Sequence, residues 1–513
     1  MLKTIANKEN NIVSFYLTGH DYEFELKNVY KIFDFNSEIK IYHENEIDFN
    51  NSRFIILSEI ISSPKGLACK TVLYIDKIQT ACISIHENDI RIEKNDLKKL
   101  KKTIVKKSLY DVLSQYFDEK SEYGFLTGVR PNKILISAMK NNISREDTNL
   151  ILKNTYEVSD EKIKLLNEVF DRQAKCIFNT RTCINSSFDK EKYNLYIHIP
   201  FCPTKCNYCS FVSFSKYDKN VLNEYVDNLI YEIEKTIELA IINKLELNTI
   251  YFGGGTPSVL SVKNIDDIFS VIKKYYHLEN VTEISFEAGR PDTIDEEKLR
   301  CLKRNYVNRI SINPQTMNNN TLSKMFRTHS AADIENSYNL SRKIGFNSIN
   351  MDLIIGLPEE SPEDVLNSIK KVAELKPDNI TVHSLSYKKG SFLLNNTKDL
   401  SKDTNIIKEM YDITKRICSE NGYKPYYMYR QKNIKGNLEN IGYALESKES
   451  IYNIVIIEEI ETILACGAGA VSKILKGDER HERVQNYKDL KEYNKNVQKN
   501  IDEKCRKMAD WVL

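Results

Sequence analysis

The sequence predicts an α/β protein whose central part is a partial barrel of six parallel strands, a (β/α)6 arrangement. From Tyr193 onward, short apolar segments alternate with amphipathic helical stretches of about 10 to 20 residues. Strands that alternate with helices pair in parallel through helical crossovers. Glycine, cysteine and charged residues follow these strands, at the end where barrels bind ligands. The six segments are YNLYIHI, NTIYF, TEISFE, NRISI, INMDLII and ITVHSL.

Four regions are expected along the chain. Residues 1–95 form a small β-rich module, because short apolar runs such as FIILSEI, TVLYIDK and ACISIHE are separated by polar breaks. Residues 96–185 form a helical connecting region, since apolar residues recur three and four positions apart. Residues 186–400 hold the barrel, and residues 401–513 form a mixed α/β carboxy-terminal region, with strands expected around Tyr423 and Ile451.

Composition limits the class of partner. The chain has 74 basic and 72 acidic residues, so no net charge attracts nucleic acid or an anionic membrane. The first residues lack the charged and then apolar pattern of a secretory signal, and no apolar stretch is long enough to span a bilayer. We therefore expect a cytoplasmic protein with no nucleic-acid or membrane partner. The composition does not predict its oligomeric state.

Three of the 11 cysteines, Cys202, Cys206 and Cys209, lie close together after the first barrel strand. By composition alone this spacing has about 0.005 expected occurrences, so chance does not account for it. Three thiolates suit a four-iron, four-sulfur cluster that keeps one iron open to another ligand. Structural zinc is the alternative, and it would need a fourth ligand from His198 or from a distant cysteine.

Other candidate residues follow the later strands. Gly253–Thr256 leaves backbone bare for a ligand, or forms only a tight turn. Glu287 could accept hydrogen bonds from an amine or a ribose, and Arg327 could bind a carboxylate. Alternatively, either residue could belong to a surface ion pair. Asp352 lies within an apolar strand, where an acid without a polar partner carries a desolvation penalty.

Taken together, these motifs resemble the radical S-adenosylmethionine (SAM) superfamily. Within it, they resemble the oxygen-independent coproporphyrinogen III dehydrogenase (oxidase) family, in its HemZ-type branch. The resemblance covers about residues 193–473, and LTGVRP and PYYMYRQKN point to the same branch. The motifs are YIHIPFCPTKCNYCSF, YFGGGTPS, FEAGRPDTI, NRISINPQTM, MFRTH, NMDLIIGLPEE and GAGAVSK.

The resemblance implies that Cys202, Cys206 and Cys209 are the catalytic and metal-ligating residues of a radical SAM barrel, holding a 4Fe-4S cluster. One or two molecules of SAM would bind beside it. A 5′-deoxyadenosyl radical would then remove hydrogen from coproporphyrinogen propionates, which lose carbon dioxide and become vinyl groups in haem biosynthesis. The implied cofactor-binding residues are Tyr196, Tyr208, Gly254, Gly255, Thr256, Glu287, Gln315, Arg327 and Asp352.

The resemblance also implies partners and an alternative function. A porphyrinogen would be the substrate, a flavodoxin or ferredoxin would donate electrons, and residues 401–513 would cover the substrate. Dehydrogenases of the family carry a further cysteine two residues after the third ligand, where this chain has Phe211, as haem chaperones of the HemW type do. Haem binding and delivery is therefore the alternative. A radical enzyme acting on RNA is disfavoured, because no basic tail or nucleic-acid module is present.

Overall fold

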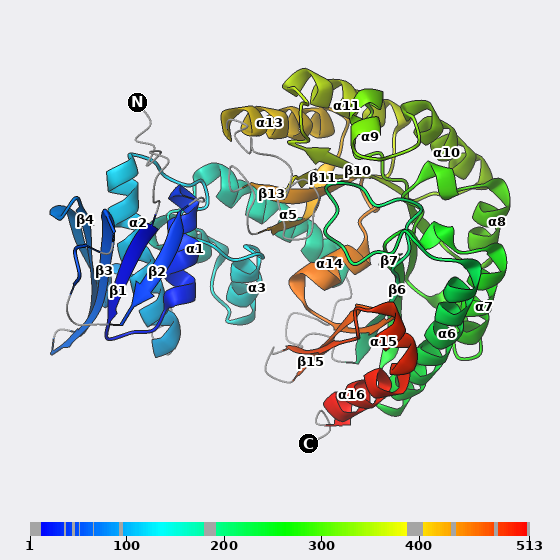
Figure 1. Cartoon of the computed structure of the whole chain (residues 1–513), viewed down its shortest axis with the longest axis horizontal. Helices are drawn as coiled ribbons and strands as arrows, with labels where there is room; N and C mark the ends of the chain where they lie inside the picture. The colour runs from blue at the N-terminus through cyan, green and yellow to red at the C-terminus, as the bar shows by residue number, and fades with distance from the viewer. Residues whose placement is uncertain are drawn as a thin grey trace. The chain divides into compact units, whose positions relative to one another are not determined.

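A computed structural model describes most of the chain in two compact units, Met1–Asn167 and Glu168–Leu513 (Figure 1). The region boundaries predicted near residues 95, 185 and 400 fall in segments 92–95, 179–190 and 387–403, outside the described residues. The four-region division therefore stays a prediction. The described residues are 12–34, 37–43, 47–50, 52–64, 66–91, 96–178, 191–386, 404–431, 438–476 and 481–509.

The first unit contains a five-stranded sheet in the order β2-β1-β3-β4-β5. The strands predicted at FIILSEI, TVLYIDK and ACISIHE are confirmed as parts of β3, β4 and β5. A helix that the sequence analysis did not predict, α1, connects the parallel strands β1 and β2. The strands are β1 (Ile12–Thr18), β2 (Glu38–Tyr42), β3 (Phe54–Ser63), β4 (Gly66–Ile75) and β5 (Ile78–His86).

Helices of the first unit supply half of its core. Leu26, Val29 and Tyr30 recur three and four positions apart on α1, so they form one buried face. This face packs with α2 residues such as Leu109 and strand residues such as Phe15. The helices are α1 (Glu23–Phe33), α2 (Leu97–Phe117), α3 (Lys133–Lys140), α4 (Arg145–Leu150) and α5 (Asp160–Phe178), which continues past the end of the unit.

The second unit is built on an 11-stranded sheet, and the predicted run of six parallel strands at its centre is confirmed. Beyond them, β14 pairs parallel with β6, and β13 pairs antiparallel with β11. The six strands are β6 (Lys192–Ile199), β7 (Glu246–Gly254), β8 (Glu283–Glu287), β9 (Arg309–Ser311), β10 (Ile349–Ile355) and β11 (Asn379–Ser384). The others are β12 (Lys424–Arg430), β13 (Glu439–Ala444), β14 (Thr462–Cys466), β15 (Val471–Leu475) and β16 (His481–Gln485).

Helices α6, α7, α8, α10 and α11 lie along the outer side of the parallel strands (Figure 1). Their starts are fixed locally, since Asp218, Ser261, Ser330 and Ser361 each accept a backbone N–H of the first helical turn. The helices are α6 (Lys219–Ile242), α7 (Val262–Lys273), α8 (Glu296–Arg304), α9 (Asn319–Lys324), α10 (Ala331–Ile344), α11 (Pro362–Leu375), α13 (Thr404–Glu420), α14 (Ile451–Glu458), α15 (Leu490–Lys495) and α16 (Val497–Ala509).

One prediction for the carboxy-terminal region is wrong. The segment at Ile451 begins helix α14 rather than a strand, and its apolar run packs on the buried residues of β12. A short apolar run does not distinguish a buried helix from a strand, which explains the error.

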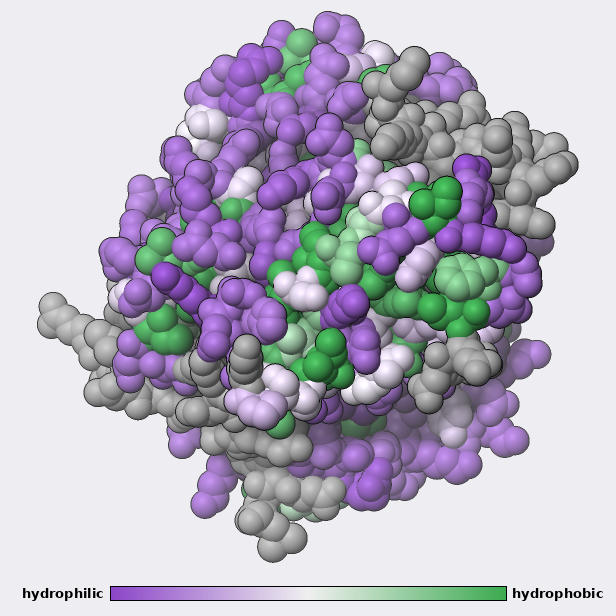
Figure 2. Space-filling view, turned by 90° about the vertical axis from the view of Figure 1, so that its left-hand side faces the viewer, coloured by the Kyte–Doolittle hydropathy of each residue, from purple (hydrophilic) through white to green (hydrophobic). Residues whose placement is uncertain are grey.

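The face of the molecule in Figure 2 is mostly hydrophilic, with hydrophobic residues gathered near its centre and in smaller patches elsewhere. Within the described part of the chain, no helix is both long and apolar enough to cross a membrane.

Candidate active site

The three cysteines lie on the loop that leaves the carboxyl end of β6. Two backbone hydrogen bonds close the base of this loop: Cys202 N donates to Phe214 O at 3.0 Å, and Phe214 N donates to Pro200 O at 2.7 Å. Within the loop, Cys209 N donates to Cys206 O at 3.1 Å. All three cysteines are partly exposed, so the loop presents three thiols beside the end of the barrel.

The glycine-rich turn at the end of β7 packs directly on the cysteine loop. Gly255 N donates to Ile199 O at 2.8 Å, and Thr256 N donates to Phe201 O at 2.7 Å. A Cβ atom on Gly255 would lie 2.6 Å from Phe201 O and 3.0 Å from Cys202 Sγ. The turn therefore has no room for a side chain at this position, so close approach requires the glycine.

Arg327 is a buried residue of the site and not part of a surface ion pair. One guanidinium nitrogen donates to Asn313 O at 2.6 Å and to Gly289 O at 3.0 Å. A second guanidinium nitrogen, Nη1, donates to Tyr208 OH at 3.2 Å and lies 4.0 Å from Cys206 Sγ. This cation therefore joins the cysteine loop to the ends of β8 and β9.

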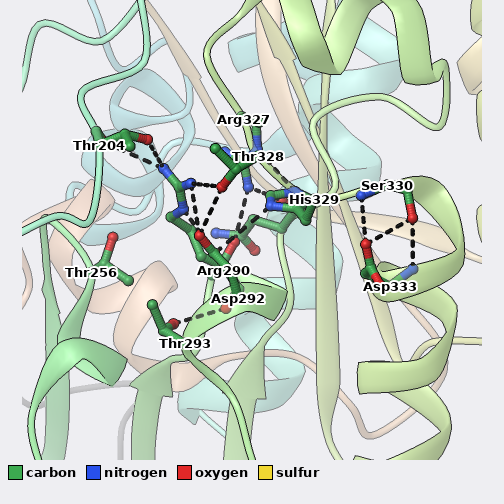
Figure 3. Close-up of polar contacts among 12 residues, drawn as sticks. Thr204, Thr256, Arg290, Asp292, Thr293, Arg327, Thr328, His329, Ser330 and Asp333 are labelled. Atoms are coloured by element: carbon green, nitrogen blue, oxygen red, sulfur yellow. Dashed lines mark hydrogen bonds and ion pairs between the residues drawn. The ribbon is translucent and has the colours of Figure 1, made fainter.

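A second buried arginine, Arg290, holds the other side of the cysteine loop (Figure 3). It donates to Thr204 Oγ1 at 2.8 Å and forms two bonds to the Asp292 carboxylate, at 3.0 and 3.1 Å. Burial would raise the pKa of Asp292, but hydrogen bonds from His329 and Arg290 bring it well below its usual range. A pocket of about 500 Å³ lies beside this network and is lined by Thr204, Phe326, Arg327, His329 and Asp333, among others.

Inside the barrel, partly exposed side chains near the carboxyl ends of the strands contact one another. Tyr251 OH donates to Glu287 Oε1 at 2.7 Å. The Tyr251 ring stacks on Tyr452 at 4.3 Å and lies 6.1 Å from Tyr196, between ring centroids. The enclosed position of Glu287 raises the pKa of its carboxyl to about 7, and the neighbouring Asp352 adds to this rise.

Asp352 has the polar partners that its place in an apolar strand requires. Asn350 Nδ2 donates to Asp352 Oδ1 at 2.7 Å, and His383 Nε2 lies 3.7 Å from Oδ2. Enclosure opposes ionisation, but these neighbours lower the pKa of the carboxyl overall. His383 in turn contacts Tyr429, whose hydroxyl lies 3.2 Å from Nδ1. A polar chain thus runs from β10 across β11 to β12.

Gln315 has a strained backbone and an unused side-chain oxygen. Its φ is +68°, in the left-handed region that a residue with a side chain rarely adopts. Hydrogen bonds to Asp352 O (2.8 Å) and from Ile354 N (2.9 Å) hold this conformation. Gln315 Oε1 is buried without a hydrogen-bond partner among the described residues, so it can accept one from a ligand.

The predicted site residues thus form two groups around the same end of the barrel. The first group surrounds the cysteines and contains Tyr208, Gly255, Thr256 and Arg327; the second lies within the barrel and contains Tyr196, Gly254, Glu287, Gln315 and Asp352.

The sequence analysis missed Tyr251, Arg290, His383 and Tyr452 as site residues. His383 and Tyr251 could have been found, because both lie near the ends of predicted strands. Tyr452 had no such signal, since it comes from the apolar helix α14.

The donor set fits an iron–sulfur cluster better than zinc. Three thiolates on one zinc would lie within about 4 Å of one another, given a Zn–S bond of about 2.3 Å. Among the described His, Cys, Asp and Glu residues, no group of three or more could hold a single metal ion. His198, the fourth zinc ligand considered, is buried with Nδ1 2.9 Å from Tyr196 OH. A cubane instead takes each thiolate on a different iron, which suits wider spacing.

Comparison with known proteins agrees with this fold. A model of the radical SAM superfamily matches residues 196–372. The chain is 39% identical over 418 residues to the oxygen-independent coproporphyrinogen-III oxidase-like protein HemZ of Bacillus subtilis, covering 81% of this chain and 82% of that protein. The chain belongs to the HemZ-like family of radical SAM proteins.

Other proteins are similar to parts of this HemZ-like chain. The heme chaperone HemW of Lactococcus lactis is 32% identical over 280 residues, which cover 54% of this chain and 68% of that protein. The structure of coproporphyrinogen III oxidase (HemN) from Escherichia coli, described as a radical SAM enzyme, matches with a TM-score of 0.51 at 24% identity. That match covers 61% of this chain and 70% of the other, and it shows the shared fold.

Proposed function

We propose that this HemZ-like protein is an oxygen-independent coproporphyrinogen III dehydrogenase of the cytoplasm. Cys202, Cys206 and Cys209 would hold a 4Fe-4S cluster, and SAM would bind its open iron. The observation that carries the proposal is that two of the three thiols contact residues at the barrel end, since Thr256 bonds Cys202 and Arg327 lies beside Cys206. Membership of the family supports it.

When bound, the cluster and SAM would supply the chemistry of a 5′-deoxyadenosyl radical, which could take a hydrogen atom from the β-carbon of a propionate. In the proposed reaction each propionate would then lose carbon dioxide and pass one electron to an acceptor distinct from SAM, which would leave a vinyl group, and two rounds would give protoporphyrinogen IX. A flavodoxin or ferredoxin would supply the electron that starts each round.

The residues of the chain would bind and orient the reactants. Glu287 and Gln315 offer acceptors for the amine or ribose hydroxyls of SAM, and Asp352 offers a carboxylate already ionised by its neighbours. Bare backbone at Gly254 and Gly255 lets a ligand approach the strand end. The stacked rings of Tyr251 and Tyr452 would line part of the interior and limit the entry of water there.

Delivery of haem is the second candidate function. Two observations favour it: relatives that match the barrel are named heme chaperones, and Phe211 stands where dehydrogenases of the family have a further cysteine. In this case the same cluster site would be kept while haem, rather than a porphyrinogen, would bind.

An anaerobic assay separates the two functions. The reconstituted protein is incubated with reductant, SAM and coproporphyrinogen III, and protoporphyrin and methionine are measured by chromatography. Cys206→Ser removes one proposed ligand, and Cys505→Ser changes an exposed cysteine on α16 as the matched control. Protoporphyrin formed by wild type and Cys505→Ser but not by Cys206→Ser supports the dehydrogenase. Stoichiometric haem binding without protoporphyrin contradicts it and supports the chaperone.

A further inference from the structure

A fully buried ion pair joins the carboxy-terminal helix to α6. Lys504 Nζ lies 2.6 Å from Glu232 Oε1, and both side chains are 0% exposed. Burying two charges carries a desolvation penalty that only good geometry and further hydrogen bonds offset, and apolar residues of similar size often serve stability equally well. The pair therefore calls for an explanation other than stability.

The hydrogen bonds to Glu232 show what the pair holds. Its carboxylate accepts from Tyr493 OH at 2.6 Å, from Asn486 Nδ2 at 2.7 Å and from Gly467 N at 2.7 Å. Asn486 Nδ2 also donates to Gly467 O at 2.9 Å. Both backbone groups of Gly467 are therefore fixed, which sets the position of the loop that follows β14.

The loop that follows β14 packs against the end of β6. Gly467 has a φ of +109°, and a Cβ there would lie 2.5 Å from both His198 O and Tyr225 OH. The hydroxyl of Tyr225 accepts from Ala468 N at 3.2 Å and donates to His198 O at 2.6 Å. One hydroxyl thus bridges the loop held by Glu232 to the last residues of the first barrel strand.

The same tyrosine contacts the start of the cysteine loop. Its ring meets Phe201 edge-on, with 5.1 Å between centroids, and Phe201 directly precedes Cys202. The backbone from His198 to Cys202 is therefore held by Tyr225 on one side and by the glycine-rich turn on the other.

We propose that Tyr225 is a positioning residue for the cysteine loop, and that the Lys504–Glu232 pair holds it in place through Gly467 and Ala468. Helix α16 thereby contributes to the cluster site although it lies far from the cysteines in sequence. The inference rests on the proposed function, because the loop needs positioning only if it holds a cluster.

Tyr225→Phe tests the inference, since it removes the bridging hydroxyl and keeps the ring contacts. Tyr231→Phe is the matched control on the same helix, where the hydroxyl bonds Gln498 at an exposed site. Iron content, the rate of iron loss to a chelator and the electron paramagnetic resonance spectrum of the reduced protein are measured after anaerobic reconstitution. Thermal unfolding of the apoprotein is followed by circular dichroism.

We expect Tyr225→Phe to lose iron about fivefold faster than wild type, the factor that corresponds to one hydrogen bond. Its spectrum should change while that of Tyr231→Phe does not. Equal iron loss and equal spectra for both variants would overturn the inference. So would faster loss that is matched by an equal destabilisation of the apoprotein, because that result shows a merely structural role.

Two further results distinguish a failure of this inference from a failure of the proposed function or of folding. If wild type holds no oxygen-sensitive cluster, the proposed function fails before the variants are compared. If Tyr225→Phe does not fold, Tyr493→Phe probes the same connection from its other end, because it removes one hydrogen bond to Glu232 and leaves Tyr225 unchanged. Faster iron loss supports the inference, and unchanged loss contradicts it.

Discussion

The hydroxyl of Thr256 donates a hydrogen bond of 3.4 Å to the sulfur of Cys202. This bond joins the turn after β7 to the loop after β6, although the two residues are 54 positions apart in sequence. Substitutions in the turn should act on the cysteines, and those elsewhere in the strand should not.

Gly255→Ala should disrupt the cysteine loop. The added methyl group would meet the Phe201 carbonyl at 2.6 Å, and backbone cannot move aside as a flexible side chain can. We expect a loss of most of the iron bound after reconstitution. Gly128→Ala is the control, because nothing lies within 4 Å of the added atom there. Normal iron content in Gly255→Ala would contradict the contact.

Glu287 should make SAM binding depend on pH. The folded protein raises the pKa of this carboxyl to about 7, so between pH 6 and 8 it changes from mostly protonated to mostly ionised. Because the ionised form accepts better from an ammonium group, affinity should rise about tenfold over this range. Calorimetry on the reconstituted protein measures it. Glu287→Gln should bind more weakly and show a flat profile; a profile equal to wild type would exclude this role.

The same shift has the opposite effect on the stability of the free protein. A carboxyl whose folded pKa lies above its ordinary value of 4.5 favours folding below that value. This contribution is lost as pH rises toward 7. Unfolding curves of wild type and Glu287→Gln, recorded without SAM, should therefore converge at low pH and diverge near pH 7, with the variant the more stable.

Arg327→Lys should not preserve the site. Lysine cannot donate at once to Asn313 O, Gly289 O and Tyr208 OH, because it lacks the planar fork of the guanidinium. With its partners left unsatisfied in a buried position, we expect a loss of about 3 kcal/mol in the free energy of unfolding. Urea unfolding measures it, with Arg304→Lys on the surface of α8 as the control. Equal stability of the two variants would refute the prediction.

His20 should weaken the first unit in mild acid. Its Nδ1 accepts from Tyr22 N at 3.3 Å and its Nε2 lies 3.0 Å from Ser58 Oγ, an arrangement of the neutral ring. Burial lowers its pKa from 6.5 to about 4, so the unfolded chain takes the proton first as pH falls. Stability is fully present above pH 6.5 and declines by about 2–3 kcal/mol toward pH 4.

Hydrogen exchange of the β1 and β3 amides in the full chain, corrected for intrinsic rates, checks this decline. His20→Gln should reduce the pH dependence, whereas His277→Gln changes an exposed histidine of the second unit and should not. The same pH dependence in wild type and His20→Gln would assign the effect to other groups.

Much of the barrel was predictable because each part of its signal is local. Alternating apolar segments and helices define β6 to β11, and the cysteine spacing defines the loop after β6. The strand predicted at Ile451 is wrong for the converse reason. The apolar run there suits a strand or a buried helix equally well, and only its packing against β12 shows that it is a helix.

The sequence by itself determined the parallel barrel, the cysteine loop and the residue types at the strand ends, because strand periodicity and motif spacing are properties of neighbouring residues. Only the tertiary structure decided which charged side chains are buried and which residues they contact. Arg327, which could have been a surface cation, is enclosed beside Cys206, and Lys504 meets Glu232 across 272 positions. Such partners come together only when separate helices pack on one sheet, so no local pattern encodes them.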